Sequence, residues 1–405
     1  MSIRGNSTLL KNINRSLIIN TIKAKEPISR AEIVNITRLA LPTVLRNVNK
    51  LIEEGIILET GKKETDAGRR PIMLEINKSA GFYVGVSFGR KVNVILTDFA
   101  GNVLDDCRKN SYMTEGPTGH IKQIKKIIFD LMENNNIELS QIMGMGVATL
   151  DTGFKTGSTI SSSEFYGWEK IDNAKLISKI IPEIKSKFEY LPICGAVAEQ
   201  WFGGSVELEN ILYLYVDYGV GGGLIMDGKV YKGKDGHSAH LGHHVVNFDG
   251  RQCYCGNKGC LETYTSTTAI VNEIKEKVNS GEIKGYLSRY KNDVSKIDFN
   301  MIEDRYQNND QDVIDIIMNA SKILGVGIGN AINLYNPDVV ILGGEISNTF
   351  PKLVNEAKRV AKEHVFMMSS KNTPIRISSN GINSEALGAI ALIMGEIYKI
   401  NTFRE

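Results

Sequence analysis

The sequence has few of the features that mark exported or membrane-embedded proteins. No apolar run approaches the roughly 18 residues that a membrane-spanning helix needs, and the opening stretch MSIRGNSTLLKNINRS shows no apolar signal-peptide region. Cysteines number five, an odd count that disfavours a disulfide framework. Nine prolines and 42% hydrophobic residues allow substantial buried cores, and 405 residues suggest two or three domains. We therefore expect a soluble, cytoplasmic protein without a membrane partner.

The excess of one sign of charge is also small overall, but the charges are unevenly distributed along the chain. The formal net charge is +2, whereas residues 1–78 hold 14 Lys and Arg against 8 Asp and Glu, which leaves 34 basic and 38 acidic residues in the rest. A merely solvated charged surface would not predict this segregation. It is the distribution expected when a basic end contacts phosphate and a larger, slightly acidic part senses something else.

Two short helices are predicted at the basic end of the chain. Apolar residues at helical spacing predict a helix over about 7–24, and the dipeptide Glu26-Pro27 ends it. Ser29, with Glu32 three residues later, has the pattern of a reciprocal capping box. This pattern predicts a second helix that ends near Thr37.

A third helix follows, and Pro42 suits its first residue. Its predicted buried face consists of Val44, Leu45, Val48, Leu51 and Ile52. The opposite face carries four polar side chains that could reach base edges and phosphates in the major groove: Thr43, Arg46, Asn47 and Lys50. The alternative is an ordinary solvated helix face, but three short helices followed by a basic hairpin favour a recognition helix.

The hairpin is predicted from two strand-like segments, 56–60 and 72–76. Four basic residues between them could reach backbone phosphate or a narrow minor groove: Lys62, Lys63, Arg69 and Arg70. The run Gly68–Pro71 could equally be a join to the next domain. We predict that residues 1–78 form a winged helix-turn-helix domain that binds double-stranded DNA. Because one recognition helix reads few base pairs, we expect a homodimer, or a dimer of dimers, on a palindromic operator.

A candidate metal site follows from one histidine and three cysteines: His243, Cys253, Cys255 and Cys260. One imidazole and three thiolates can hold Zn²⁺ tetrahedrally in a closed structural site. Gly256 and Gly259 would let the backbone turn tightly enough for the three sulfurs to converge. The alternatives are a disulfide between two of these cysteines, and three reduced thiols that happen to be neighbours.

The stretch that contains these ligands, GHHVVNFDGRQCYCGNKGCLE, resembles the zinc-binding signature of the ROK family of repressors, open reading frames and sugar kinases. GVGGGLIMDGKVYKG before it and NPDVVILGGEIS after it also resemble this family, and the amino-terminal helices resemble those of its xylose and N-acetylglucosamine repressors. The resemblance covers nearly the whole chain. It implies an α/β protein, with a two-lobed actin-like ATPase fold over residues 79–405 serving as sensor and dimerisation domain. It leaves two functions open, sugar phosphorylation and sugar-responsive repression.

The helix-turn-helix departs from the family pattern at two positions. Arg38 stands where the relatives usually have a turn glycine, and Ala40 where they usually have a serine. Neither change removes a DNA contact. Each removes local support for a turn or a helix cap, which typically costs about 1 kcal/mol of stability.

Several residues that the family's kinases need are replaced in this chain. Ser87 stands where the kinases carry an Asp for metal, Val220 stands where they usually carry a Thr, and the stretch 191–198, LPICGAVA, lacks the Asp that serves as general base. Without these groups, phosphoryl transfer loses two separate contributions to lowering its barrier. The resemblance therefore implies a repressor that binds no ATP and carries no catalytic residues. The alternatives are a kinase with a rearranged site and a repressor controlled by a protein partner.

The family's sugar pocket is only partly kept. Glu164 replaces an Asn ahead of Gly167-Trp168, and His240 replaces a Glu, whereas the His and Glu found at positions 243 and 262 are retained. The resemblance implies an effector site made of Glu164, His240, His243 and Glu262. Because acidic groups are lost, we expect this site to favour a sugar phosphate or sugar acid, paired with a protonated His240, over a neutral sugar. An empty pocket is the alternative.

Overall fold

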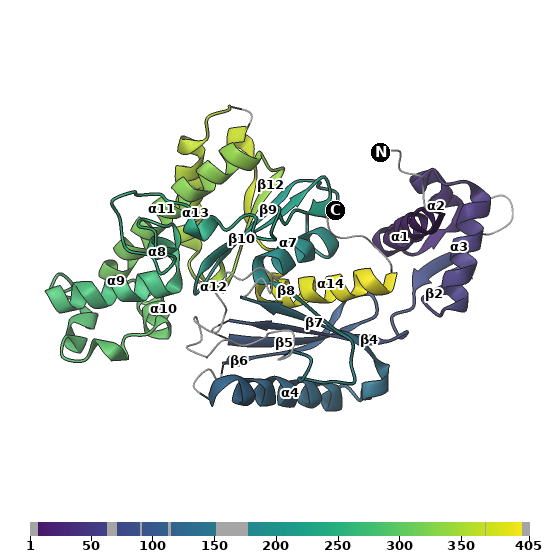
Figure 1. The fold of residues 1–405 in the computed structure, drawn as a ribbon, viewed down its shortest axis with the longest axis horizontal. Helices are drawn as coiled ribbons and strands as arrows, with labels where there is room; N and C mark the ends of the chain where they lie inside the picture. Colours follow the sequence, from purple (N-terminus) through teal and green to yellow (C-terminus); the bar gives the residue numbers. More distant parts are fainter. Residues whose placement is uncertain are drawn as a thin grey trace. The chain divides into compact units, whose positions relative to one another are not determined.

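The computed structural model describes residues 7–62, 71–89, 91–111, 115–150, 177–368 and 370–398 of the chain (Figure 1). The chain divides into two compact units. The first comprises Met1–Ala148, Ser161–Phe188 and Ala389–Glu405, and the second comprises Thr149–Ile160 and Glu189–Gly388. The expected division between residues 78 and 79 remains a prediction. Among the described residues, no helix has the length and apolar character that crossing a membrane requires.

The amino-terminal part is a winged helix-turn-helix. Its elements are α1 (Ser7–Lys25), β1 (Ile28–Ser29), α2 (Arg30–Thr37), α3 (Leu41–Glu53), β2 (Ile57–Lys62) and β3 (Ile72–Ile76). Ser29 caps α2 through both bonds of the predicted capping box with Glu32. The strands form an antiparallel sheet in the order β1-β3-β2, in which Ile28 lies opposite Leu74. The three helices and the hairpin were predicted from the sequence, and the short strand β1 was not.

The turn between α2 and α3 contains both departures from the family pattern. Arg38 adopts a left-handed conformation with φ of 58°, which a side chain disfavours and a glycine would not. Ala40 occupies the position before the first residue of α3, where a serine hydroxyl could bind a free amide of the first turn. The structure therefore puts each substitution where its local cost was expected.

The rest of the first unit is built on a five-stranded sheet in the order β6-β5-β4-β7-β8. Its strands are β4 (Phe82–Phe88), β5 (Lys91–Asp98), β6 (Val103–Asn110), β7 (Ile142–Thr149) and β8 (Ser186–Tyr190). The helix α4 (Gly116–Asn134) lies on one face and α14 (Ser384–Tyr398) on the other (Figure 1). Gly146 permits this packing, because a side chain there would collide with the backbone of Ala389.

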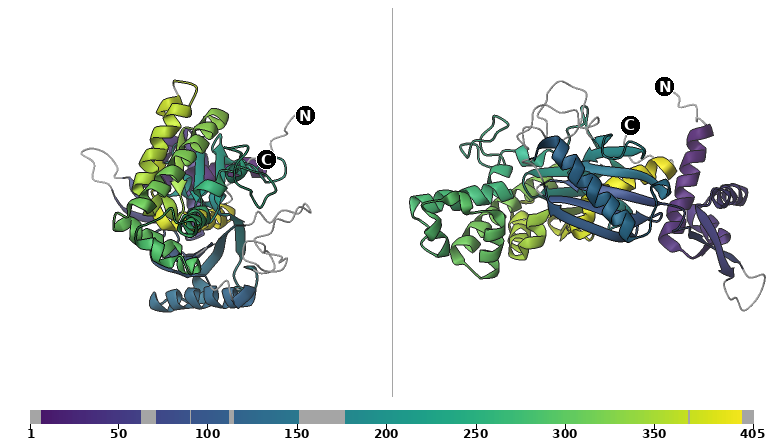
Figure 2. Two further views of the ribbon diagram at one scale, coloured as in Figure 1. Left: turned by 90° about the vertical axis from the view of Figure 1, so that its left-hand side faces the viewer. Right: turned by 90° about the horizontal axis from the view of Figure 1, so that it is seen from below.

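The second unit contains another five-stranded sheet, in the order β11-β10-β9-β12-β13. Its strands are β9 (Ile211–Val216), β10 (Val220–Met226), β11 (Lys229–Val230), β12 (Val339–Gly343) and β13 (Ile375–Ile377). Its helices are α7 (Leu191–Trp201), α8 (Glu262–Thr265), α9 (Thr267–Ser280), α10 (Phe299–Gln307), α11 (Gln311–Tyr335), α12 (Glu345–Thr349) and α13 (Pro351–His364). Helices α11 and α13 lie side by side (Figures 1 and 2). Gly325 of α11 permits this close packing, because a side chain there would collide with Val360 of α13. The two sheets with their helices confirm the predicted α/β class and its two lobes.

Candidate metal centre and nucleic-acid interface

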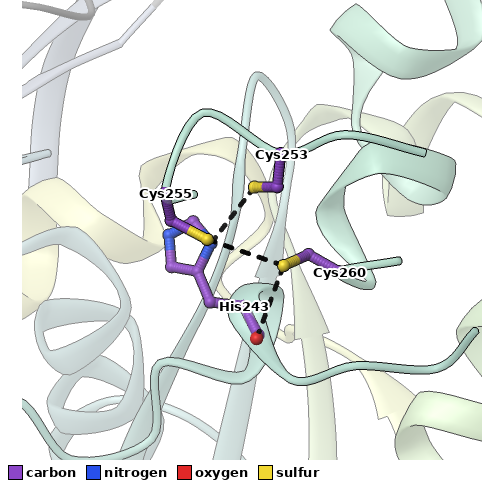
Figure 3. Close-up of side chains that lie close together, drawn as sticks. All are labelled: His243, Cys253, Cys255 and Cys260. Carbon is purple, nitrogen blue, oxygen red and sulfur yellow. Dashed lines mark hydrogen bonds between the residues drawn. The ribbon is translucent and has the colours of Figure 1, made fainter. Parts of the chain in front are cut away.

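The four predicted metal ligands converge in the second unit (Figure 3). His243, Cys253, Cys255 and Cys260 each offer one ligand atom, and these atoms all lie within 4.8 Å of one another. The sulfurs of Cys255 and Cys260 are 3.7 Å apart, as are the Cys253 sulfur and Nδ1 of His243. Ligands about 2.3 Å from a tetrahedral zinc lie about 3.8 Å apart, so the spacing suits this ion. A disulfide, with sulfurs about 2.05 Å apart, is not formed, and all five cysteines are free thiols.

A tight loop holds the cysteines in place. The amide of Gly256 donates to the carbonyl of Cys253 at 3.1 Å, and Gly256 itself has φ of 95°. Gly259 has φ of 70°, and a Cβ at this position would lie 1.5 Å from the carbonyl oxygen of Asn247. Both glycines are therefore required for the sulfurs to converge, as the sequence predicted. Burial raises the pKa of the Cys260 thiol and so favours its neutral form, whereas a bound cation would favour the thiolate.

Tyr254, between the first two cysteines, is a residue that the sequence did not single out. Its hydroxyl lies 3.2 Å from Nε2 of His243, and the two rings meet edge to face with centroids 5.3 Å apart. His243 therefore turns Nδ1 toward the sulfurs and Nε2 toward Tyr254. A hydrogen bond at the far nitrogen fixes the tautomer and orientation of a histidine ligand. Only its position between two ligands could have signalled this role.

Three of the four predicted effector residues gather next to this centre, and Glu164 lies outside the described residues. The rings of His240 and His243 have centroids 6.5 Å apart, and the ring of His240 also lies 5.5 Å from that of the half-buried Tyr190. The carboxylate of Glu262 accepts a hydrogen bond from the amide of Val220 at 2.7 Å. The site is thus richer in aromatic and imidazole rings than the sequence suggested.

The structure argues against the expected protonation of His240. Burial, and to a smaller extent the neighbouring His237 and His243, lower the pKa of His240 to about 4. At neutral pH this imidazole is therefore uncharged. A protonated His240 is consequently not the partner that an anionic effector would meet, and the expected preference for an anion loses its electrostatic basis.

The positions that a kinase would use hold apolar or structural groups. The acid-free stretch 191–198 lies in α7 and is buried, and Val220, at the start of β10, is also buried. Ser87 lies buried in β4 of the first unit. Glu199, a carboxylate beside the stretch that lacks the general base, is fully buried and accepts hydrogen bonds from the amide of Ser379 and other groups of the turn 378–380. Its surroundings are those of a structural group.

The predicted recognition helix has most of the expected buried face. Val44, Val48 and Leu51 are completely buried and Ile52 is half-buried, whereas Leu45 is 38% exposed. The expectation that Leu45 belongs to the core is therefore wrong. It lies one turn beyond the exposed Leu41, outside the buried stripe that Val44, Val48 and Leu51 form.

The predicted DNA-contacting residues differ in how freely they can reach a ligand. Arg46 and Lys50 are exposed, and Lys50 forms a loose ion pair with Glu54 at 3.8 Å. Asn47 is half-buried and donates from its amide to the carbonyl of Thr43 at 2.8 Å. Lys62 ends β2, but its side chain lies outside the described part of the structure, as do Lys63, Arg69 and Arg70.

Comparison with known proteins supports both parts of this description. Residues 83–396 match the model of the ROK family, and residues 11–57 match that of a winged helix-turn-helix DNA-binding domain. The xylose repressor of Caldicellulosiruptor bescii is 29% identical over 405 residues, covering 97% of this chain and 98% of that protein. The DNA-binding transcriptional dual regulator NagC of Escherichia coli K12 is 26% identical, covering 96% and 94%. A solved ROK family transcriptional regulator, described as a homolog of the E. coli MLC protein, matches with a TM-score of 0.75 at 23% identity over 97% of this chain and 99% of that one; it shares the fold.

Proposed function

This chain belongs to the ROK family, and we propose that it is a DNA-binding repressor of carbohydrate-metabolism genes that responds to a sugar or sugar derivative. One observation carries the proposal. A winged helix-turn-helix with an exposed basic helix face precedes a ROK domain in which Ser87 and Val220 stand at the positions of phosphoryl-transfer groups and the stretch 191–198 contains no acid. Relatives that match over nearly their whole length are named xylose repressor and N-acetylglucosamine repressor. The protein is thus a regulator without kinase activity or bound ATP.

DNA recognition is assigned to residues 1–78. Helix α3 enters the major groove, where Arg46 and Lys50 have the freedom to contact base edges and phosphates, with Thr43 and Asn47 at the side of the same helix. The four basic residues of the wing contact the DNA backbone: Lys62, Lys63, Arg69 and Arg70. Such a repressor acts in the cytoplasm as a homodimer or dimer of dimers, because two recognition helices related by a two-fold axis read a palindrome.

The second unit carries a structural zinc and the effector site. His243, Cys253, Cys255 and Cys260 would hold the ion, whose bonds cross-link the 253–260 loop to the turn that carries His240 and His243. The effector site includes His240, His243 and Glu262, and its ligand is a sugar, a sugar phosphate or a sugar acid. Because His243 belongs to both sites, effector binding would be coupled to the conformation of the 253–260 loop.

Selection of duplexes from a random library, followed by footprinting of the selected operator, tests this function. The footprint should be palindromic, and it should weaken or change when one member of a panel of sugars, sugar acids and sugar phosphates is added. A parallel assay of the same panel with ATP and Mg²⁺ should show no phosphorylation. Failure to select any duplex, together with turnover of a sugar, would replace the repressor with a kinase.

A further inference from the structure

Two leucines on the surface of α3 have no place in the hydrophobic core. Leu41 is 49% exposed and Leu45 is 38% exposed, and a separation of four residues puts them on one side of the helix. The core-facing side is already made by Val44, Val48 and Leu51, each with no exposed area. Contact between these two leucines of a 13-residue helix and water is unfavourable. A ligand that covers them would remove this unfavourable contact.

The polar side chains of the same helix do not provide a contact that recognises thymine. The Asn47 amide donates to the carbonyl of Thr43 at 2.8 Å, and the side-chain oxygen of Asn49 lies 3.5 Å from the guanidinium of Arg30. On α3, Arg46 and Lys50 are therefore the long basic side chains that can extend from the surface. These groups suit guanine and phosphate, and they do not distinguish thymine from the other bases.

We propose that Leu41 and Leu45 read the C5-methyl groups of thymines in the major groove. The major groove presents phosphates at its edges and thymine methyls on its floor, so a ligand of this kind matches a surface that combines basic and apolar side chains. Leu41 lies in the first turn of α3, the end from which recognition helices contact base edges. Protein docking surfaces, in contrast, are depleted in lysine, which Lys50 supplies here. The inference rests on the proposed DNA-binding function and adds a base preference to it.

Replacing single thymines with deoxyuridine in a duplex selected by the wild-type protein tests the contact, because this change deletes only the methyl group. At one or two positions in each half-site, binding should weaken about three- to fivefold per methyl, the effect of losing one buried carbon. Leu41→Ala or Leu45→Ala should weaken binding to the thymine duplex by a similar factor. Combining the variant with the deoxyuridine at its contact should weaken binding no further than either change alone.

Leu17→Ala is the matched control, because Leu17 is a leucine of α1 with a comparable 40% exposure. It should leave both the affinity and the deoxyuridine effect unchanged. Selected duplexes that bind equally with and without every thymine methyl would overturn the inference and leave the proposed function intact. Leucine variants that change the sedimentation of the free protein but keep the deoxyuridine effect would also overturn it, by identifying a protein docking surface. Failure to select any duplex would overturn the proposed function itself.

Discussion

The carboxylate of Glu199 accepts a hydrogen bond from the backbone amide of Ser379 at 2.9 Å, and thereby joins two segments 180 residues apart in the sequence. The Ser378 hydroxyl and the Asn380 amide donate to the same oxygen. Because Glu199 has no exposed area, all its acceptor capacity serves the packing of α7 against this turn. The relationship gives this carboxylate a structural role in a place where the kinases of the family keep a catalytic acid nearby.

Glu199→Gln should therefore lower the stability of the protein without any effect on sugar turnover. A glutamine offers one acceptor oxygen in place of two and loses the charge, so we expect a loss of about 1–3 kcal/mol in the free energy of unfolding. Urea denaturation measures this loss. Assays with hexoses, ATP and Mg²⁺ should stay at background for the wild-type protein and the variant. Wild-type turnover that Glu199→Gln abolishes would show that the carboxylate acts as a base.

Purified protein should contain about one zinc per chain, and Cys255→Ser should lower metal content and stability together. A structural zinc contributes folding free energy directly, and a serine hydroxyl is a poor replacement for a thiolate. Elemental analysis and thermal denaturation provide the two measurements. Cys107→Ser is the control, because Cys107 is a free thiol in β6 outside the cluster. Full stability after complete removal of the metal would contradict a structural role.

Arg46→Ala should weaken operator binding by about 1–3 kcal/mol and relax sequence preference if Arg46 contacts a base. Lys50→Ala should act similarly if its ammonium leaves Glu54 for the DNA. By contrast, Lys62→Ala and Lys63→Ala should weaken binding to all sequences alike and reduce the salt dependence, as expected for phosphate contacts. Titrations of the selected operator and a scrambled duplex at several salt concentrations separate these cases. Unchanged affinity in all four variants would remove the assignment of this domain to DNA binding.

Two substitutions should strengthen the turn between α2 and α3. Arg38→Gly relieves a left-handed backbone at φ of 58°, and Ala40→Ser supplies a cap for α3; we expect gains of up to about 1 kcal/mol and about 0.5–2 kcal/mol. Hydrogen exchange of the α2 and α3 amides reports the local stability. Ala31→Ser, an exposed alanine already inside α2, is the control without a capping position. Equal exchange in all three variants and the wild type would refute this account of the turn.

The buried His120 should make stability fall in mild acid. Burial lowers its pKa to about 4, while its Nδ1 lies 2.9 Å from the Ser111 hydroxyl and its ring meets that of Phe88 edge to face. Between pH 4 and the ordinary value near 6.5, the unfolded chain binds a proton that the folded chain does not. This histidine's contribution is therefore fully present above about pH 6.5 and is lost as the pH falls toward 4, by on the order of 3 kcal/mol.

Urea denaturation of wild type and His120→Gln between pH 7.5 and 5 isolates this contribution, because acid loss of zinc would affect both proteins equally. The difference between the two should shrink or reverse at lower pH. Parallel curves over the whole range would show that His120 does not titrate as its burial requires.

Much of the local structure follows from short-range sequence. The capping box of Ser29 and Glu32 and the apolar spacing of α1 and α3 involve interactions within a few residues, which the sequence displays directly. The metal cluster is similar, because three ligands lie within eight residues and two glycines set the loop. The short strand at residues 28–29, in contrast, could not be predicted from the sequence. Two residues carry too little pattern to reveal a strand, and their pairing with β3 depends on a partner more than forty residues away.

The sequence by itself determined the order of the domains, the helices of the DNA-binding part, the four members of the histidine and cysteine cluster and the absence of an acid at 191–198. Only the tertiary structure decided which groups are buried and what they contact. Burial makes His240 a neutral imidazole, and packing places the Glu199 carboxylate where the turn at 378–380 donates hydrogen bonds to it. The narrow core of the helix-turn-helix leaves Leu45 exposed. The physical reason is that helical periodicity and ligand spacing are local properties, whereas desolvation and long-range hydrogen bonding depend on segments that meet only after folding.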